Sequence, residues 1–295
     1  MKKNILVTGS KGQLGSELKE LASDYPDHEF FFTSREDLDI CNKKALKEFV
    51  TSNQIETIVN CAAYTAVDKA ESEPKLADEI NHLAVKSLAE ISVEKNLRLI
   101  HISTDYVFNG KGFRPYPTDH PTDPLNVYGN TKLAGEKALI TVNPKNSMII
   151  RTSWVYSSFG NNFVKTMLRL GKERKELNVI CDQVGAPTYA RDLARFILSR
   201  GLKVKTNQVA VYHFSNEGVC SWYDFAREIM ADAGLECEVN PIQTTAYPTL
   251  AKRPYYSLMD KSRITTELNY NIPNWKDSLK ICIQKLKETS VRLNS

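Results

Sequence analysis

At 295 residues the chain is longer than one typical domain and shorter than three, so we expect one large domain and a smaller companion lobe. Its 42% hydrophobic and 25% charged residues exclude extended disorder, and a formal net charge of +4 is too small for a nucleic-acid-binding surface. The first apolar run, Ile5-Leu6-Val7, is too short for a signal peptide and no later run could span a bilayer, which predicts a cytoplasmic protein with no membrane partner.

The first half of the chain alternates short apolar runs with amphipathic stretches. The apolar runs predict strands at Asn4–Thr8, Glu29–Thr33, Thr57–Asn60, Arg98–Ser103 and Ser147–Arg151. The amphipathic stretches predict helices at Leu14–Ala22, Lys43–Ser52, Lys75–Glu94 and Asn130–Val142. Strands that alternate with helices indicate right-handed βαβ units, and therefore an α/β fold with a doubly wound, Rossmann-like parallel sheet.

The alternation weakens after residue 151, where aromatic and proline-containing segments appear. Helical patterns return at Tyr189–Ser199, Trp222–Ala233 and Trp275–Glu288, and Ser221 is a suitable N-cap for the second of these. We therefore expect residues 1–151 to form the first domain and residues 152–295 to form mainly a smaller α/β lobe. Elements around residues 189–233 are expected to return to the first domain.

A glycine-rich turn follows the first strand and precedes the first helix. Glycines let the backbone approach a pyrophosphate, and a helix N-terminus offers free N–H groups. The spacing is GxxGxxG and not GxGxxG, so a simple tight connection is the alternative. Its position makes residues 1–151 a predicted dinucleotide-binding domain, with these cofactor-binding candidates: Gly9, Ser10, Lys11, Gly12, Gln13, Leu14 and Gly15.

The second strand ends in Thr33-Ser34-Arg35, where an NAD-specific site often has an acidic residue. Two hydroxyls and a guanidinium are suited to a 2′-phosphate, so we expect NADPH with NADH tolerated; the alternative is that Arg35 points into solvent. Asp39 and Ile40 follow at a spacing that could reach the adenine. Small residues after the third strand let the cofactor pass close to the backbone, which adds Ala62, Ala63, Tyr64 and Thr65 as candidates.

A tyrosine and a lysine four residues apart follow the fourth strand. Tyr128 and Lys132 would share one helix face, and Thr104 ends the strand. Hydride addition to a ketone forms an alkoxide that must be protonated as it forms, and a neighbouring ammonium would lower the phenol pKa from its usual value of about 10. The alternative is an exposed helix contact. Placement after a dinucleotide turn favours a catalytic Thr104, Tyr128 and Lys132.

Several longer stretches carry a family resemblance. They are Asn60–Glu71, Ser103–Phe108, Pro124–Gly129, Lys132–Glu136, Arg151–Tyr156, Gly160–Phe163, Asp182–Thr188, Arg253-Pro254 and Ser257-Leu258. With the glycine turn, they resemble the extended short-chain dehydrogenases/reductases and, within them, the dTDP-4-dehydrorhamnose reductases (dTDP-L-rhamnose synthases). The resemblance implies NADPH- or NADH-dependent reduction of the C4 keto group of dTDP-4-dehydro-6-deoxy-L-mannose to dTDP-L-rhamnose.

The resemblance also implies roles for individual residues. Tyr128 would donate a proton to the sugar C4 oxygen, and Lys132 would also bind the nicotinamide ribose. The sugar would contact Thr104, Asp105 and Trp154, whereas the nucleotide or diphosphate would lie near Asn161, Asn162, Asp182, Gln183 and Arg253. Two of these have alternatives, because Trp154 could pack the lobe interface and Arg253 could form a surface ion pair.

A metal site is not expected. The six cysteines include no CxxC pair, and the five histidines never reach metal-site spacing. Some family members have Mg²⁺ held by glutamates at a dimer contact; Glu17 is available here, but Arg191 stands where a carboxylate would be needed. This argues against Mg²⁺-mediated dimerisation and leaves a homodimer open.

Two other functions compete with a reductase. A dehydratase or epimerase of the same superfamily would need an Asp-Glu pair after the fourth strand, and here Asp105 is followed by Tyr106. The regulatory beta subunit of methionine adenosyltransferase has a similar fold and keeps most of these motifs. A non-catalytic role would show as co-purification with a synthetase and no turnover of nucleotide ketosugars.

Overall fold

Six parallel strands form the central sheet of the computed structural model, which describes residues 2–294, with side chains described as far as Thr289. The strand order is β10-β5-β4-β3-β1-β2. Their bounds are β1 Lys3–Thr8, β2 His28–Thr33, β3 Thr57–Asn60, β4 Arg98–Thr104, β5 Met148–Thr152 and β10 Ala210–Phe214. The order reverses next to β1, and ligands of open parallel sheets bind at such a reversal, beyond the carboxyl ends of the strands.

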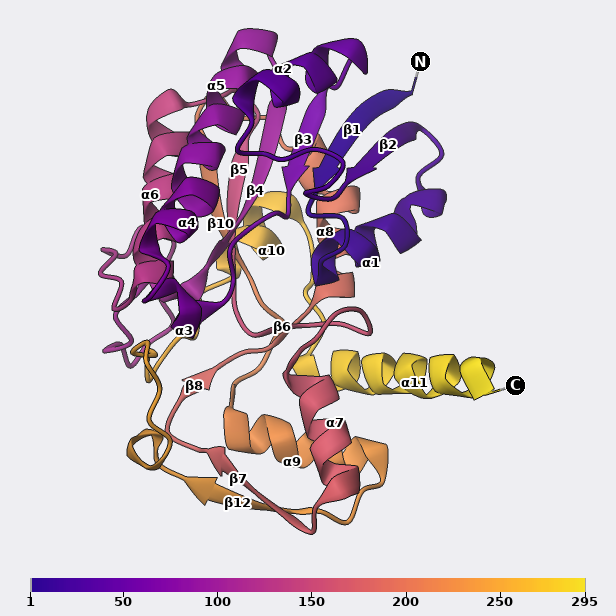
Figure 1. The fold of residues 1–295 in the computed structure, drawn as a ribbon, viewed down its shortest axis with the longest axis vertical. Helices are drawn as coiled ribbons and strands as arrows, with labels where there is room; N and C mark the ends of the chain where they lie inside the picture. Colours follow the sequence, from indigo (N-terminus) through magenta and orange to yellow (C-terminus); the bar gives the residue numbers. More distant parts are fainter. Residues whose placement is uncertain (1, 295) are drawn as a thin grey trace.

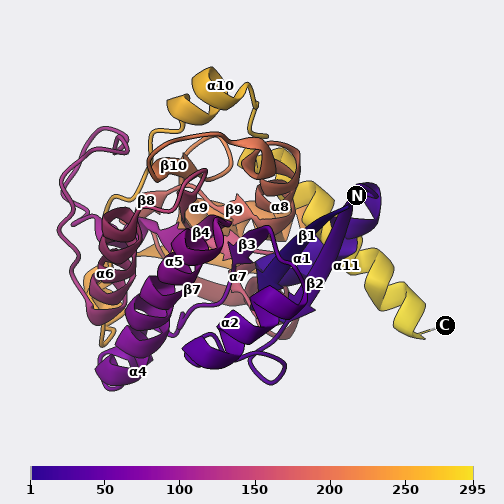
Figure 2. The same cartoon turned by 90° about the horizontal axis from the view of Figure 1, so that it is seen from above.

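Helices cover both faces of this sheet (Figures 1 and 2). One face carries α1 Gln13–Leu21, α8 Ala190–Ser199 and α10 Ser262–Leu268, and the other carries α2 Lys43–Ser52, α5 Ala84–Lys95 and α6 Val127–Val142. Alternate residues of β1 enter the two cores, because Ile5 and Val7 belong to the cluster around α1 and α8 and Leu6 belongs to the cluster around α2 and α5. The doubly wound α/β fold expected from the sequence is confirmed.

One predicted helix is interrupted. The stretch Lys75–Glu94 forms α4 Pro74–Asp78, a π-helical turn η2 Glu79–Leu83, and then α5; the short α3 Val67–Ala70 precedes it. Gly135 of α6 packs so closely on the carbonyl of Asn81 that a β-carbon there would overlap it. Such π-turns commonly mark functional sites.

The second lobe lies below the sheet in Figure 1. It contains α7 Phe163–Glu173, α9 Trp222–Ala233 and the parallel pair β7 Glu176–Ile180 and β12 Glu238–Ile242, with α11 Trp275–Asn294 alongside. Ser221 caps α9 through a capping box with Asp224, as the sequence predicts. Short pairs complete it: β6 Val155–Tyr156 with β9 Thr188–Tyr189, and β8 Val184–Gly185 with β11 Cys220–Ser221.

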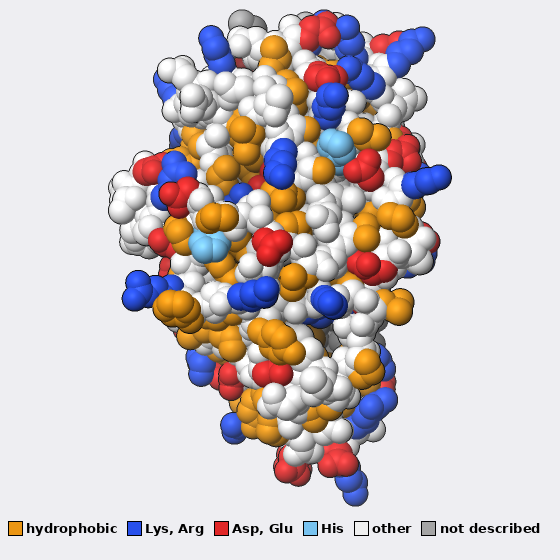
Figure 3. Space-filling view, turned by 90° about the vertical axis from the view of Figure 1, so that its left-hand side faces the viewer, with side chains coloured by type: hydrophobic (Ala, Val, Ile, Leu, Met, Phe, Trp, Pro, Cys, Tyr) orange, Lys and Arg blue, Asp and Glu red, His pale blue; other side chains and the backbone are white. Residues whose placement is uncertain are grey.

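The returning elements divide between the two parts. β10 pairs with β5, and α8 packs against α1, whereas α9 packs in the lobe against α7 and α11. The domain boundary at residue 151 stays a prediction. On the face that carries α4, α5 and α6, acidic and basic side chains are interspersed (Figure 3). Within the described part of the chain, every helix is too short or too polar to cross a membrane.

Candidate active site

A cavity of about 970 Å³ lies beyond the carboxyl ends of β1, β3 and β4, between the sheet and the lobe. It brings together residues that are far apart in the sequence. The predicted site residues that line it are Gly9, Gly12, Gln13, Leu14, Arg35, Asp39, Ile40, Ala62, Ala63, Tyr64, Thr65, Thr104, Asp105, Tyr128, Lys132, Trp154, Asn161 and Asn162. Six predicted residues are not part of the lining: Ser10, Lys11, Gly15, Asp182, Gln183 and Arg253.

The glycine turn is built for a close approach to a ligand. Gly9 has φ +66°, and a β-carbon there would stand 2.7 Å from the Ala62 nitrogen of the neighbouring strand end. A β-carbon on Gly15 would overlap the Gly9 carbonyl, so Gly15 supports the turn from behind. α1 begins at Gln13, so its free N–H groups face the cavity. This cradle fits the diphosphate of a dinucleotide.

Ser10 and Lys11 are outside the cavity lining. The Ser10 N–H donates to the Thr33 carbonyl at 3.0 Å, which ties the turn to β2. The Lys11 ammonium pairs with Glu36 at 2.9 Å on the surface. Both residues therefore shape the turn without lining the site.

Charged groups of both signs surround the far end of the cavity after β2. The Arg35 side chain is 71% exposed and lies 3.7 Å from the Asp39 carboxylate. The Ser34 hydroxyl hydrogen-bonds the Glu36 and Asp37 carboxylates at 2.6 and 2.7 Å. Those bonds lower the pKa of both carboxyls, that of Glu36 to about 2, so both are ionised at neutral pH.

Asn81 is a buried residue behind the cavity wall that the sequence reasoning missed. Its side chain accepts from the Tyr64 N–H at 2.9 Å and donates to the Tyr64 carbonyl at 3.1 Å, which fixes the strand-end segment Ala62–Thr65. The Tyr64 phenol donates to Glu73 at 2.7 Å. The only signal in the sequence is a polar residue inside a helical pattern.

Thr104, Tyr128 and Lys132 converge on the cavity. Thr104 ends β4, and its hydroxyl hydrogen-bonds the Tyr128 phenol and the Asp105 carboxylate. Asn126 caps α6 by accepting from the Gly129 N–H at 2.7 Å, so Tyr128 and Lys132 lie on the first turns of that helix.

Lys132 is 1% exposed, and its ammonium donates to the Ile102 carbonyl at 2.6 Å. Burial lowers the pKa of Lys132 to about 8. The cavity therefore holds a buried amine that titrates near neutral pH.

The phenol pKa moves opposite to the sequence expectation. Burial raises the pKa of Tyr128 to about 12, opposed by the Thr104 hydrogen bond, whereas the sequence argument expected Lys132 to lower it. The Lys132 ammonium is directed toward the Ile102 carbonyl, so the desolvation of the phenol dominates. Tyr128 is therefore protonated at neutral pH, the state that a proton donor requires.

Asp105 is a buried carboxyl beside this group. It is 2% exposed, and burial raises its pKa to about 7, opposed by hydrogen bonds from Ser257 and Thr104. Its Oδ2 atom has no hydrogen-bond partner in the described chain. Asp105 is thus available to a polar ligand near Thr104.

Two stacked tryptophans form the lobe side of the cavity. Trp154 has φ +48°, a sparsely populated conformation for a bulky residue, and its ring stacks on Trp222 with centroids 3.8 Å apart and planes 13° apart. Both rings line the cavity, so Trp154 contributes to lobe packing and to the site together. The sequence reasoning missed Trp222, which stands at the start of α9.

The other predicted substrate residues divide into two groups. Asn162 caps α7 and donates to the Gln13 amide oxygen at 2.9 Å, which joins the lobe to the glycine turn. Outside the lining, Asp182 and Gln183 hydrogen-bond Thr244, and Arg253 forms a two-pronged ion pair with Asp68 at 2.7 and 3.0 Å. Their contact with a nucleotide stays a prediction.

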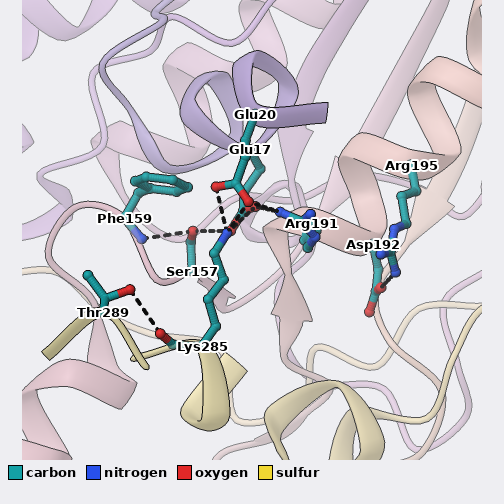
Figure 4. A network of polar contacts seen from close by, with 9 residues as sticks. All are labelled: Glu17, Glu20, Ser157, Phe159, Arg191, Asp192, Arg195, Lys285 and Thr289. Carbon is teal, nitrogen blue, oxygen red and sulfur yellow. Dashed lines mark hydrogen bonds and ion pairs between the residues drawn. The ribbon is translucent and has the colours of Figure 1, made fainter. Parts of the chain in front are cut away.

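A network of charged side chains surrounds Glu17, the carboxylate available for a Mg²⁺ site (Figure 4). Glu17 is fully buried and accepts from Ser157 at 2.6 Å and from Arg191 at 3.1 Å, with the Lys285 ammonium 3.6 Å away. A divalent cation needs several oxygen ligands, and two positively charged side chains beside this carboxylate would repel it. Among the described residues, no cluster of three His, Cys, Asp or Glu has metal-binding geometry.

Comparison with known proteins identifies the family. The family model described as RmlD substrate binding domain matches residues 1–288. A dTDP-4-dehydrorhamnose reductase of Aggregatibacter actinomycetemcomitans is 41% identical over 285 residues, which cover 94% of this chain and 97% of that protein.

Solved structures agree. A dTDP-4-dehydrorhamnose reductase of Clostridium acetobutylicum superposes with a TM-score of 0.91 at 40% identity, covering 96% of this chain and 99% of that one. A dTDP-4-dehydrorhamnose reductase of Bacillus anthracis in complex with NADP superposes with a TM-score of 0.91 at 38% identity, covering 97% of this chain and 100% of that one. The chain belongs to the dTDP-4-dehydrorhamnose reductase family.

Proposed function

We propose that this protein reduces the C4 keto group of dTDP-4-dehydro-6-deoxy-L-mannose to give dTDP-L-rhamnose, with NADPH as the preferred cofactor. The observation that carries the proposal is the convergence of Thr104, Tyr128 and Lys132 in the cavity that the glycine turn opens. The nucleotide and the sugar come from the family, in which a relative has that activity in its name and another binds NADP.

Each residue of the trio has a separate task. NADPH, when bound, supplies the hydride that reduces the ketone. The Tyr128 phenol donates its proton to the C4 oxygen, and burial keeps that proton in place until the oxygen becomes basic. The Thr104 hydroxyl, bonded to the phenol, orients the same oxygen. Lys132 would hold the nicotinamide ribose, and its charge favours the phenolate after proton transfer.

The chain's own residues suggest how the cofactor would be held. The N–H groups of the glycine turn and of the start of α1 that make no hydrogen bond within the protein would bind the diphosphate. Asp39 and Ile40 would face the adenine, and the segment Ala62–Thr65 would pass beneath the ribose. Arg35 is the cation available for a 2′-phosphate; its exposure and its long contact with Asp39 leave it free to turn toward one.

The lobe would hold the nucleotide-linked sugar. We assign the sugar to Asp105 and the stacked pair Trp154 and Trp222, and the diphosphate to the region of Asn161. A buried carboxyl with a pKa of about 7 can donate to or accept from a sugar hydroxyl near neutral pH. A flat indole suits the apolar face of a deoxysugar.

Turnover assays test the proposal against its alternatives. NADPH and NADH oxidation would be measured with dTDP-4-keto-6-deoxy-L-mannose and with its GDP and UDP analogues. We expect the highest kcat/KM with the dTDP sugar and NADPH. Absence of cofactor oxidation with all three sugars, together with co-purification of a synthetase, would favour the regulatory-subunit alternative; loss of water from a 4-hydroxy sugar would favour the dehydratase.

A further inference from the structure

A row of buried polar side chains runs from Lys132 into the sheet, away from the cavity. The Lys132 Nζ lies 3.4 Å from His101 Nε2, His101 Nδ1 lies 3.0 Å from the Asn60 Nδ2, and the Asn60 Oδ1 lies 2.6 Å from the Thr8 hydroxyl. All four residues are at most 1% exposed.

The sheet register makes this row. Thr8 of β1 is the direct partner of Asn60 of β3, and Asn60 is the direct partner of His101 of β4. Direct partners in neighbouring strands point to the same face, so the three side chains stand in line beneath α6. Buried polar groups in such a line must satisfy one another, because water cannot do so.

The direction of these hydrogen bonds decides whether they are satisfied. With Asn60 Nδ2 donating to Nδ1, a neutral His101 carries its proton on Nε2, which then faces the Lys132 ammonium as donor against donor. A half turn of the carboxamide exchanges its two ends. Then Nδ1–H donates to the Asn60 oxygen, the Asn60 nitrogen donates to the Thr8 hydroxyl, and Nε2 accepts from Lys132.

A second buried histidine, His213, also lies between a cation and a hydrogen-bond partner, and there the partner permits only one protonation site on the ring. His213 Nε2 lies 3.4 Å from the Arg151 guanidinium, and its Nδ1 lies 3.2 Å from the Asp260 carbonyl, which can only accept. His213 therefore carries its proton on Nδ1 and accepts from a cation through Nε2. Burial, followed by the neighbouring cation, lowers the pKa of both histidines, so both are neutral.

We propose that His101, protonated on Nδ1 by virtue of Asn60, is a positioning residue that keeps Lys132 a cation and directs it toward the cavity. With the Ile102 carbonyl and His101 Nε2 as two acceptors, one N–H of the ammonium is left for a ligand. The proposal deepens the function proposed above, and its kinetic consequence rests on that function.

The other ionisable groups around Lys132 come from several elements. Glu136 lies one turn further along α6 and is paired with Arg151 of β5, while Asp105 and Tyr128 line the cavity side. Glu136 raises the pKa of Lys132 against the larger effect of burial, which lowers it. An acceptor at His101 adds to the effect of Glu136, because a hydrogen bond donated by an ammonium is stronger than one donated by a neutral amine.

Nitrogen NMR of the wild-type protein tests the tautomer directly and needs no variant to fold. With ¹⁵N-labelled histidine, His101 and His213 are expected to show the same pattern, a protonated Nδ1 and an unprotonated Nε2. His213 is the internal standard. A protonated Nε2 at His101 would overturn the proposal, whatever the protein's substrate is.

The rate profile tests the consequence. In His101→Phe a planar aromatic ring stays and the acceptor is lost, so the alkaline limb of kcat/KM for NADPH should move down by about one pH unit. In His213→Phe, which removes a histidine outside the cavity, the limb should stay in place. An upward shift, or none, in His101→Phe would refute the positioning role. If the wild-type protein turns over no ketosugar, the proposed function fails while the NMR result still decides the tautomer.

Discussion

Arg191→Met is a direct perturbation of the network in Figure 4. Arg191 of α8 donates to Glu17 and Glu20 of α1, at 3.1 and 2.8 Å, and so joins two helices on one face of the sheet. Methionine retains an unbranched apolar side chain in place of the arginine stem and removes the guanidinium charge. Two carboxylates would then share one cation, Lys285, and Glu17 is fully buried.

The size of the stability loss depends on the contacts that Glu17 keeps in Arg191→Met. Breaking a buried ion pair and leaving a charge unpaired costs about 3–5 kcal/mol, and losing a hydrogen bond to a charged group costs about 1.5–3 kcal/mol. Ser157 and Lys285 stay in contact with Glu17, so the smaller range applies. We expect a loss of about 2 kcal/mol in the free energy of unfolding and a fall in Tm of about 4 °C.

Urea unfolding measures this, with Arg195→Met as the matched control. Arg195 lies on the same helix, its side chain is half exposed, and its ion pair with Asp192 is 4.0 Å long, so its loss should change stability by less than about 0.5 kcal/mol. Equal stability of the two variants would refute the reasoning.

EDTA and Mg²⁺ should leave the Tm of the wild-type protein unchanged. Stabilisation by Mg²⁺ would show that the network admits a metal.

Three further outcomes are expected. Arg35→Ala should raise KM for NADPH about tenfold and leave KM for NADH within twofold, measured by steady-state kinetics; equal effects would remove Arg35 from the phosphate site. Trp222→Ala should raise KM for the sugar two- to tenfold, since a stacked aromatic pair contributes about 0.5–1.5 kcal/mol, and an unchanged KM would make Trp222 a lobe-packing residue only. Burial raises the pKa of Asp105 to about 7 in the folded protein, so the carboxyl ionises at lower pH in the unfolded chain than in the folded one. The free energy of unfolding of the wild type should therefore fall relative to that of Asp105→Asn between about pH 4 and pH 7, by on the order of 4 kcal/mol. Urea unfolding across that range measures the difference, which would stay constant if the carboxyl were ionised throughout.

Local patterns were sufficient to predict five of the six strands of the sheet, whereas β10 was covered only by the expectation that elements around residues 189–233 return to the first domain. Four residues of β1 and all of β3 and β5 are buried, and buried strands of a parallel sheet read as continuous apolar runs in the sequence. The same holds for Tyr128 and Lys132, because their spacing places them on one helix face whatever the tertiary structure is.

Contacts between distant segments were beyond such patterns. The π-turn at Asn81 depends on Tyr64 and on the close approach of Gly135, and neither contact leaves a periodic signal. The short lobe pairs join residues such as Val184 and Ser221, which no hairpin spacing connects. The predicted direction of the Tyr128 pKa shift is wrong for the same reason, since burial and the partner of the Lys132 ammonium are tertiary properties.

The decisive measurement is the turnover of Tyr128→Phe with NADPH and the dTDP ketosugar, beside its affinity for NADPH. Tyr106→Phe is the control, because that ring packs edge-on against Tyr128 at 5.6 Å and has no assigned chemical task. We predict a 10²- to 10⁴-fold loss of kcat in Tyr128→Phe, the range expected for a lost general acid, with NADPH binding within about threefold of wild type. A kcat in Tyr128→Phe equal to that of Tyr106→Phe would contradict the role of the phenol as proton donor.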